Sequence, residues 1–188
     1  MNLDLSMLAI MCVTILYFLL PAYLSNSGGL IFGGGIPVDF GKSDSKGIRW
    51  IGDGVTWRGL IGGTLLGTLI GAIQGYFGPD LLALYGEYII TPIAVGVLNG
   101  VLIGFLIAFG ALVGDAAGSF LKRRLGIGRG KPAPILDQID FLVVALLFSS
   151  LVVSFTLEFI VIAIVLTIII RLIANTGAYL LGIKDVWY

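Results

Sequence analysis

The stretch GDAAGSFLKRRLGIGRGKPAPILDQID, residues 114–140, is the polar segment between the two apolar halves of this chain. It contains five of the chain's eleven Lys and Arg residues and three carboxylates, Asp115, Asp137 and Asp140. Acidic side chains suited to a divalent cation therefore share one segment with bases suited to phosphate groups. This combination is what a nucleoside-triphosphate site at a membrane surface requires.

The apolar segments around this stretch have the composition of a membrane protein. Of the 188 residues, 58% are hydrophobic and 12% are charged, and the mean hydropathy is +1.07. Several apolar runs reach the roughly 20 residues that a helix needs to cross about 30 Å of hydrocarbon. The sequence therefore predicts an all-α, polytopic integral membrane protein with a single domain over residues 1–188.

Five transmembrane helices are expected. The predicted spans cover residues 5–24, 58–76, 88–112, 141–157 and 159–181, with long polar loops at residues 25–57 and 113–140. The last apolar block, residues 141–181, is counted as two spans that turn near Glu158. A single helix of that length would measure roughly 60 Å, about twice the thickness of the hydrocarbon. The first loop is longer than an ordinary connection, which favours a functional role for it.

Glycine recurs at every fourth position in the second predicted span, from Gly59 to Gly75, and in the third, at Gly96, Gly100 and Gly104. A stripe of glycine on one helix face lets two helices approach closely in lipid. We therefore expect the second and third spans to pack against each other, and we interpret the stripe as packing rather than chemistry.

The charged residues predict the orientation of the chain. All Lys and Arg residues fall on the side of the two long loops and the C-terminal tail, whereas the other side carries only Asp4, Asp80, Glu87 and Glu158. Under the positive-inside rule the N-terminus lies outside and the C-terminus in the cytoplasm. The candidate site then lies on the cytoplasmic face of the cell membrane.

The chain has no histidine, and its single cysteine, Cys12, lies in the middle of the first apolar run. These facts exclude a Cys/His zinc site, a disulfide and a histidine general base. Any bound metal must have oxygen ligands, which favours Mg²⁺.

Asp137 and Asp140 are spaced i,i+3 and share one face if a helix begins near Pro134. With Asp115 they form a candidate magnesium site, and Lys122, Arg123 and Arg124 are candidate phosphate ligands. The alternatives are structural. Asp137 would then cap the fourth helix, Asp115 would pair with an arginine, and the basic triplet would anchor the chain to anionic lipid.

Arg171 and Asn175 lie one turn apart in the last predicted span. Ionisable groups within a membrane usually face a polar cavity, so Arg171 is a candidate ligand of a lipid phosphate. The alternative is that Arg171 snorkels or forms a structural ion pair.

The order Gly-Asp-x-x-Gly-Ser-Phe-x-Lys-Arg-Arg, a Gly-rich turn, then Asp-Gln-x-Asp resembles the signature of the CDP-diglyceride synthase superfamily. PAYLSNS at residues 21–27, FGGGIPVDFGK at 32–42, TWRG at 56–59 and the final GIKDVWY resemble its short archaeal branch, CDP-archaeol synthase. The bacterial and eukaryotic signature has Pro-Gly-His-Gly-Gly before its last acidic motif. This chain has Lys-Pro-Ala-Pro at residues 131–134 instead, so the nucleotide contacts must differ.

The resemblance implies that CTP and a phosphorylated isoprenoid glycerol ether, similar to 2,3-bis-O-geranylgeranylglyceryl phosphate, give a CDP-activated lipid and pyrophosphate. It implies a Mg²⁺-dependent cytidylyltransferase of membrane phospholipid biosynthesis, with metal on Asp115, Asp137 and Asp140 and catalytic roles for these and for Lys122, Arg123 and Arg124. The expected substrate-binding residues are Asn26, Pro37, Asp39, Lys42, Trp57, Arg58, Gly114, Gly118, Ser119, Arg129, Lys131, Arg171 and Asn175. The expected partners are CTP, this lipid and the bilayer, with no nucleic acid; a homo-oligomer is left open.

The main alternative is a small transporter or channel for an anionic substrate. A transporter would place polar residues at the midplane of several spans and would show an internal repeat. The polar residues of this chain instead collect at one face, which favours chemistry on a lipid head group.

Overall fold

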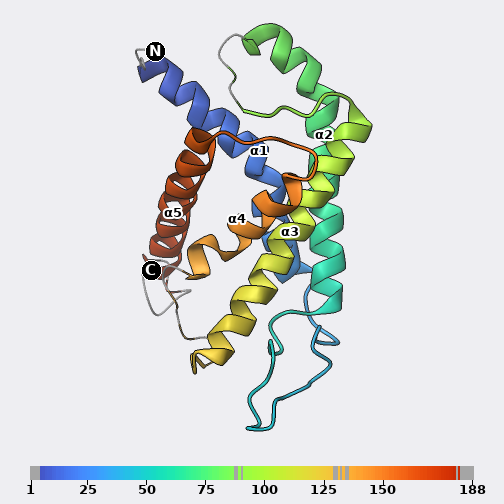
Figure 1. Cartoon of the computed structure of the whole chain (residues 1–188), viewed down its shortest axis with the longest axis vertical. Coiled ribbons are helices and arrows are strands. Elements are labelled where there is room, and N and C mark those ends of the chain that lie inside the picture. Colours follow the sequence, from blue (N-terminus) through green and yellow to red (C-terminus); the bar gives the residue numbers. More distant parts are fainter. Residues whose placement is uncertain are drawn as a thin grey trace.

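The computed structural model describes residues 5–86, 89, 91–128, 131, 133, 136–180 and 182, which form a bundle of five α-helices (Figure 1). The helices are α1 (Leu5–Ile31), α2 (Trp57–Tyr85), α3 (Val97–Arg124), α4 (Leu136–Ser149) and α5 (Leu157–Leu180). Within these ranges there is no strand, and two isolated bridges, Pro37 with Thr56 and Ser43 with Arg49, lie in the first loop. The prediction of an all-helical chain is confirmed.

Four of the five helices, α1, α2, α3 and α5, are long and apolar enough to cross a membrane. The chain is therefore a multi-pass membrane protein. The fourth predicted span is different, because α4 has only 14 residues. At 1.5 Å per residue it measures about 21 Å, less than the roughly 30 Å of hydrocarbon. The chain leaves α4 at Ser149 and re-enters a helix at Leu157, where Thr156 accepts the Phe159 N–H (3.2 Å).

Three helices extend beyond their apolar segments. Residues 25–31 belong to α1, residues 77–85 to α2 and residues 114–124 to α3, so the predicted loop boundaries at 25 and 113 were wrong. The end of α3 carries Lys122, Arg123 and Arg124, which the negative end of the helix dipole stabilises. Hydropathy marks the membrane interior and not the end of a helix, so it missed these extensions.

Two prolines lie inside helices, and in each case a neighbouring helix or loop replaces the missing hydrogen bond. Pro79 cannot donate to the carbonyl of Gly75, and the Gly96 N–H donates to that carbonyl instead (2.9 Å). Pro21 likewise cannot donate to the carbonyl of Tyr17, and Gln74 Nε2 of α2 donates to that carbonyl instead. The helices therefore continue through both prolines.

The glycine stripe of α2 serves two neighbours. A methyl group built on Gly71 would overlap the backbone of Gly100 and Gly104 of α3, which confirms the expected close pair. A methyl group on Gly63 would lie 2.5 Å from the carbonyl oxygen of Ser25, so the first half of the stripe packs against α1. Glycine thus brings α1, α2 and α3 together along one helix face.

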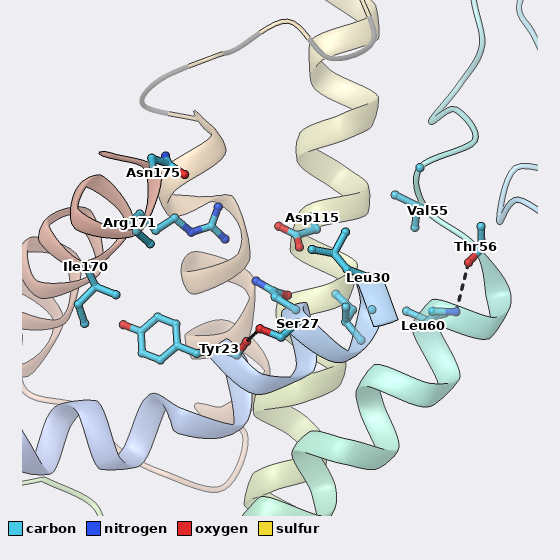
Figure 2. A pocket seen from close by; sticks show the side chains of 16 residues that line it. Tyr23, Ser27, Leu30, Val55, Thr56, Leu60, Asp115, Ile170, Arg171 and Asn175 are labelled. Atoms are coloured by element: carbon cyan, nitrogen blue, oxygen red, sulfur yellow. Dashed lines mark hydrogen bonds between the residues drawn. The ribbon is translucent and has the colours of Figure 1, made fainter. Parts of the chain in front are cut away.

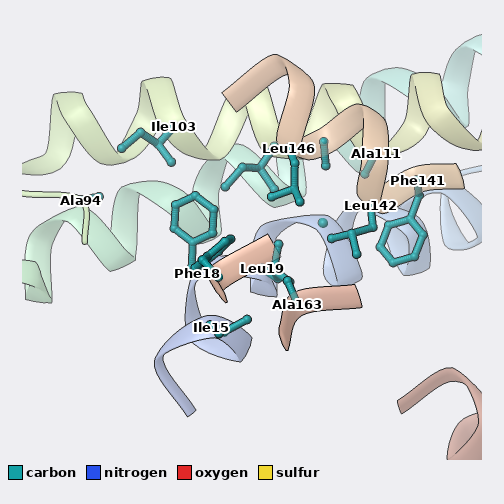
Figure 3. Close-up of a cluster of buried hydrophobic side chains, with 14 residues drawn as sticks. Ile15, Phe18, Leu19, Ala94, Ile103, Ala111, Phe141, Leu142, Leu146 and Ala163 are labelled. Atoms are coloured by element: carbon teal, nitrogen blue, oxygen red, sulfur yellow. The ribbon is translucent and has the colours of Figure 1, made fainter. Parts of the chain in front are cut away.

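The short helix α4 fills the centre of the bundle. The buried cluster joins Ile15, Phe18 and Leu19 of α1 to Phe141 and Leu142 of α4, as Figure 3 shows. Phe159 of α5 completes it, with its ring 5.6 Å from that of Phe18. Because α4 also packs against α3, this core holds the first turn of α4 beside the last turns of α3.

In Figure 1 the N-terminus and the connections α2–α3 and α4–α5 lie towards one end of the bundle. The first loop, the end of α3 and the end of α5 lie towards the other. The polar residues near the ends of α1, α3 and α5 and at the start of α4 therefore converge at a single end.

Candidate active site

A cavity of about 500 Å³ lies between α1, α2, α3, α5 and the end of the first loop. Asn26, Asp115, Arg171 and Asn175 line it, and they come from three helices that are far apart in the sequence. Figure 2 shows Asp115 and Arg171 on facing helices, with Asn175 one turn beyond Arg171. The structure thus brings these four predicted site residues together.

Asn26 connects the carboxylate to the guanidinium. With its amide oriented to suit both neighbours, it donates to Asp115 Oδ2 (3.1 Å) and accepts from Arg171 Nη2 (3.3 Å). Arg171 also donates to the backbone carbonyl of Asp137 and lies over the ring of Phe141, 4.2 Å from its centroid. Arg171 is therefore held by α1 and α4 and does not snorkel out of the bundle.

Asp140 lies against α3 at two glycines. A methyl group built on Gly114 would be 2.6 Å from the Asp140 carbonyl oxygen, and one built on Gly118 would overlap the Asp140 carboxylate. Gly114 and Gly118 therefore let α4 approach so closely that Asp140 and Asp115 interact electrostatically. The Phe141 N–H donates to Asp140 Oδ1 (2.7 Å).

Asp137 is already paired in this arrangement. Lys122 Nζ donates to Asp137 Oδ1 (2.5 Å), and the Ala133 N–H donates to Oδ2 (2.8 Å). The contact with the Ala133 N–H at the start of α4 agrees with the alternative in which Asp137 caps this helix. Within the residues that the structure describes, no three Asp, Glu, Cys or His side chains are grouped closely enough to hold one metal ion together.

The three consecutive bases point to different partners. Lys122 faces the carboxylates, whereas Arg123 Nη1 donates to the Ile127 carbonyl (2.6 Å). Arg124 Nη1 binds Asp44 Oδ2 of the first loop (2.5 Å). Among these bases, Lys122 is the one whose ion pair lies next to the acidic residues of the site.

The first loop, residues 32–56, is folded around Asp39. This carboxylate is only 2% exposed, and Arg49 donates to both of its oxygens. The hydrogen bonds from Arg49, together with backbone N–H groups of Gly52, Ile51 and Gly41, hold the pKa of Asp39 well below its usual range despite its burial. In this structure Asp39 binds groups of the loop itself, and the role as a substrate ligand that the resemblance implies stays a prediction.

The other predicted residues that the structure describes do not line the cavity. Pro37 is bridged to Thr56, the Trp57 ring lies 6.0 Å from that of Phe40, and the Arg58 side chain lies beside Gly35. Lys42 and Lys131 are exposed and Ser119 is half-buried on α3. Arg129 lies outside the described residues.

Several lining residues were missed from the sequence. Tyr23, Ser27 and Leu30 of α1 line the cavity with Asn26, at helical spacing. This periodicity was visible in the sequence, but the helix was predicted to end at residue 24. Thr56, which caps α2 by accepting the Gly59 N–H (3.2 Å), also lines the cavity.

A solved structure described as an intramembrane enzyme for archaeal membrane lipids biosynthesis has a similar fold. Its TM-score is 0.71 and its sequence identity 37%, over 85% of this chain and 91% of that one. The fold, the apolar spans and the charged cavity thus define a multi-pass intramembrane enzyme.

The model of the CarS-like family, described as CDP-archaeol synthase, matches residues 7–188. The CDP-archaeol synthase of Methanocaldococcus jannaschii is 49% identical over 177 residues, 92% of this chain and 95% of that one. That of Methanothermobacter thermautotrophicus is 49% identical over 174 residues, 93% and 92% of the two chains. The chain belongs to the CDP-archaeol synthase family, which confirms the resemblance and the prediction of an enzyme.

Proposed function

We propose that this protein transfers CMP from CTP to 2,3-bis-O-geranylgeranylglyceryl phosphate, releasing pyrophosphate and forming a CDP-archaeol-type lipid for membrane phospholipid biosynthesis. The observation that supports it best is the cavity in which Asp115 and Arg171 face each other at one end of an apolar bundle. A carboxylate suits a metal-bound triphosphate, and a guanidinium suits a phosphate monoester. The relatives carry the name of this synthase.

In the reaction, an oxygen of the lipid phosphate attacks the α-phosphorus of CTP. The bond from this phosphorus to the bridging oxygen breaks, and the electron pair leaves with pyrophosphate. The second pKa of a phosphate monoester is about 6, so the nucleophile is already largely deprotonated near neutral pH. No general base is required, which suits a chain without histidine. The protein's task is positioning and charge stabilisation.

Arg171 would hold the lipid phosphate. Its guanidinium has five N–H donors, and the contacts to Asn26 and to the Asp137 carbonyl use two of them. Leu30, Leu112 and Ile170 supply apolar walls for the beginning of the lipid chains. In this proposal the lipid head group reaches the cavity from the membrane boundary and meets Arg171 there.

Lys122 would offset charge on the leaving pyrophosphate, because it is the basic side chain next to the carboxylates. Its ion pair with Asp137 keeps it at the site before the nucleotide arrives. Arg123 remains a candidate in the same role if it exchanges its contact with the Ile127 carbonyl. Arg124, predicted for the same role, is bound to the first loop.

Mg²⁺ is the cofactor that we propose, with Asp115, Asp137 and Asp140 as its ligands. The fit rests on the donor chemistry: the available groups are carboxylates, and Asp115 and Asp140 are near enough to interact electrostatically. Asp137 would join them by exchanging its contact with Lys122. When bound, the ion supplies positive charge to the triphosphate oxygens.

We further propose that the site faces the cytoplasm and that the N-terminus lies outside. The chain would cross the membrane five times, and the fourth crossing would consist of α4 together with the chain that follows it. The support is the charge distribution, because the Lys and Arg residues collect in the loops and helix ends at the site's end of the bundle. Accessibility labelling of single cysteines placed at residues 46 and 154 in intact cells tests this orientation.

The decisive experiment is pyrophosphate release by the purified protein with each nucleoside triphosphate, Mg²⁺ and the phosphorylated ether lipid. We expect release only when CTP, metal and lipid are present together. Asp115→Ala and Asp140→Ala should abolish release while the protein stays folded in detergent. Full activity in both variants would refute the metal ligands, and no release by a folded wild type would favour a transporter.

A further inference from the structure

The first loop forms a compact unit outside the helices. Three of its backbone N–H groups donate to Asp39, and Arg49 pairs with both Asp39 and Asp53 at 2.7 Å. Asp44 accepts the N–H groups of Lys46 and Ile48, both at 2.9 Å. The loop thus has its own internal structure.

The last turn of α3 holds this unit in place. Arg124 Nη1 pairs with Asp44 Oδ2 (2.5 Å), and Arg124 Nη2 donates to the carbonyl of Arg49 (3.4 Å). The Arg124 guanidinium also lies over the ring of Phe120, 5.2 Å from its centroid. Arg124 is 31% exposed and Asp44 22%, so the pair is partly shielded from water.

The docked loop forms a wall of the cavity. Its final residues, Gly54, Val55 and Thr56, line the space into which Asp115 points. Val55 is tied to the Asp39 unit because its carbonyl accepts the Val38 N–H (3.0 Å). Helix α3 therefore supplies both Asp115 and, nine residues and about 13.5 Å further on, the residue that holds the opposing wall.

We propose that Arg124 is a positioning residue for the nucleotide, acting through its ion pair with Asp44 and not by contact with a phosphate. This inference rests on the proposed function. Arg124 does not line the cavity, and its two terminal nitrogens, Nη1 and Nη2, both bind the first loop. The helices hold the lipid and the reacting groups, whereas the loop closes the side from which a water-soluble nucleotide enters. Losing the pair should therefore raise KM for CTP and leave kcat and the lipid KM unchanged.

The test is a double-mutant cycle with Arg124→Gln, Asp44→Asn and the double variant. Asn at position 44 keeps a side-chain oxygen for the two backbone N–H groups and removes only the charge. We expect each single variant to raise KM for CTP by about threefold to fivefold, the range of a partly exposed ion pair. The double variant should be no worse than either single one, because both remove the same contact.

The sign of the Asp44→Asn effect separates this proposal from a direct phosphate contact. If Arg124 bound the nucleotide itself, removing the acidic Asp44 would free it and would leave or lower KM for CTP. That result would overturn the proposal. The matched control is Lys46→Gln in the same loop, whose side chain is exposed and which should keep the wild-type KM.

If the wild type shows no turnover with CTP, the proposed function is refuted but the docking role of Arg124 is not. A measurement that needs no substrate then tests this role. Trypsin cleavage at Lys42 and Lys46 reports how firmly the loop is docked. We expect faster cleavage in both single variants, with no further increase in the double variant. Unchanged cleavage in all three would overturn the docking role of Arg124.

Discussion

The side-chain amide of Asn26 lies 3.1 Å from Asp115 Oδ2, although 89 positions separate the two residues. The same amide accepts a hydrogen bond from Arg171, so one neutral side chain separates the carboxylate from the guanidinium. Without it, Asp115 and Arg171 could form a direct ion pair that would occupy both groups. Asn26 thus keeps the proposed metal ligand, Asp115, apart from the proposed phosphate ligand, Arg171.

Asn26→Leu should lower turnover by about 10- to 100-fold, the range for losing hydrogen bonds to charged groups. The leucine is similar in size but leaves Asp115 and Arg171 without their shared partner. Steady-state rates of pyrophosphate release measure the effect. The control is Asn99→Ala, at the end of α3 that is far from Asp115, and it should retain wild-type turnover. Equal activity of the Asn26→Leu and Asn99→Ala variants would refute the bridging role of Asn26.

Gly118→Ala should abolish turnover while the bundle stays folded. The added methyl group would overlap the Asp140 carboxylate, which must leave its present position to accommodate it. Gly177→Ala on α5 is the matched control, because a methyl group built there meets no atom within 4 Å. An active Gly118→Ala enzyme would show that Asp140 is not required in its present position.

Gln74→Leu should destabilise the fold by about 1–3 kcal/mol, because it leaves the partly buried carbonyl of Tyr17 without a donor. Pro21 is the reason that this carbonyl needs Gln74. In a Pro21→Ala background the new N–H can donate to Tyr17, so the same Gln74→Leu change should cost less. Thermal unfolding of the four proteins in detergent measures the coupling, and strictly additive effects would contradict it.

Acid should loosen the first loop before it unfolds the bundle. The pKa of Asp39 is lowered in the folded protein, so its stabilisation is fully present above the unfolded value of about 3.9. This stabilisation decreases as the pH falls from about 3.9 through the lower pKa that Asp39 has in the folded protein. Fluorescence of a variant that keeps only Trp50 would follow this transition. Asp39→Asn should already be loosened at neutral pH and should show no transition there, whereas an acid transition like that of the wild type would contradict the assignment.

The sequence predicted the parts of the fold that depend on local composition. The apolar runs predicted five spans, and four of the helices are long and apolar enough to cross a membrane. The four-residue glycine period predicted the contact between α2 and α3. Helix ends were less predictable. The second span was predicted to end at residue 76, but α2 continues through Pro79 to Tyr85. The Gly96 N–H that satisfies the Gly75 carbonyl lies in a segment that only the folded chain brings near.

The candidate site divides in the same way. Residue types pointed to Asp115 and to Arg171 with Asn175, because polar groups next to apolar helices are costly unless they face one another or a ligand. The family resemblance added Asn26. The sequence could not show which partner each residue of the basic triplet 122–124 contacts. Lys122 and Arg124 are two positions apart on one helix and so point in different directions, one to Asp137 and the other to Asp44.

By itself, the sequence determined a multi-pass helical membrane protein, its family, and the acidic and basic groups available for chemistry. These follow from composition and motif order, which do not depend on how the helices pack. Only the tertiary structure decided which charges share the cavity and which hold the loops. That choice depends on close approaches between distant segments, such as Gly118 against Asp140, and local patterns do not encode such distances.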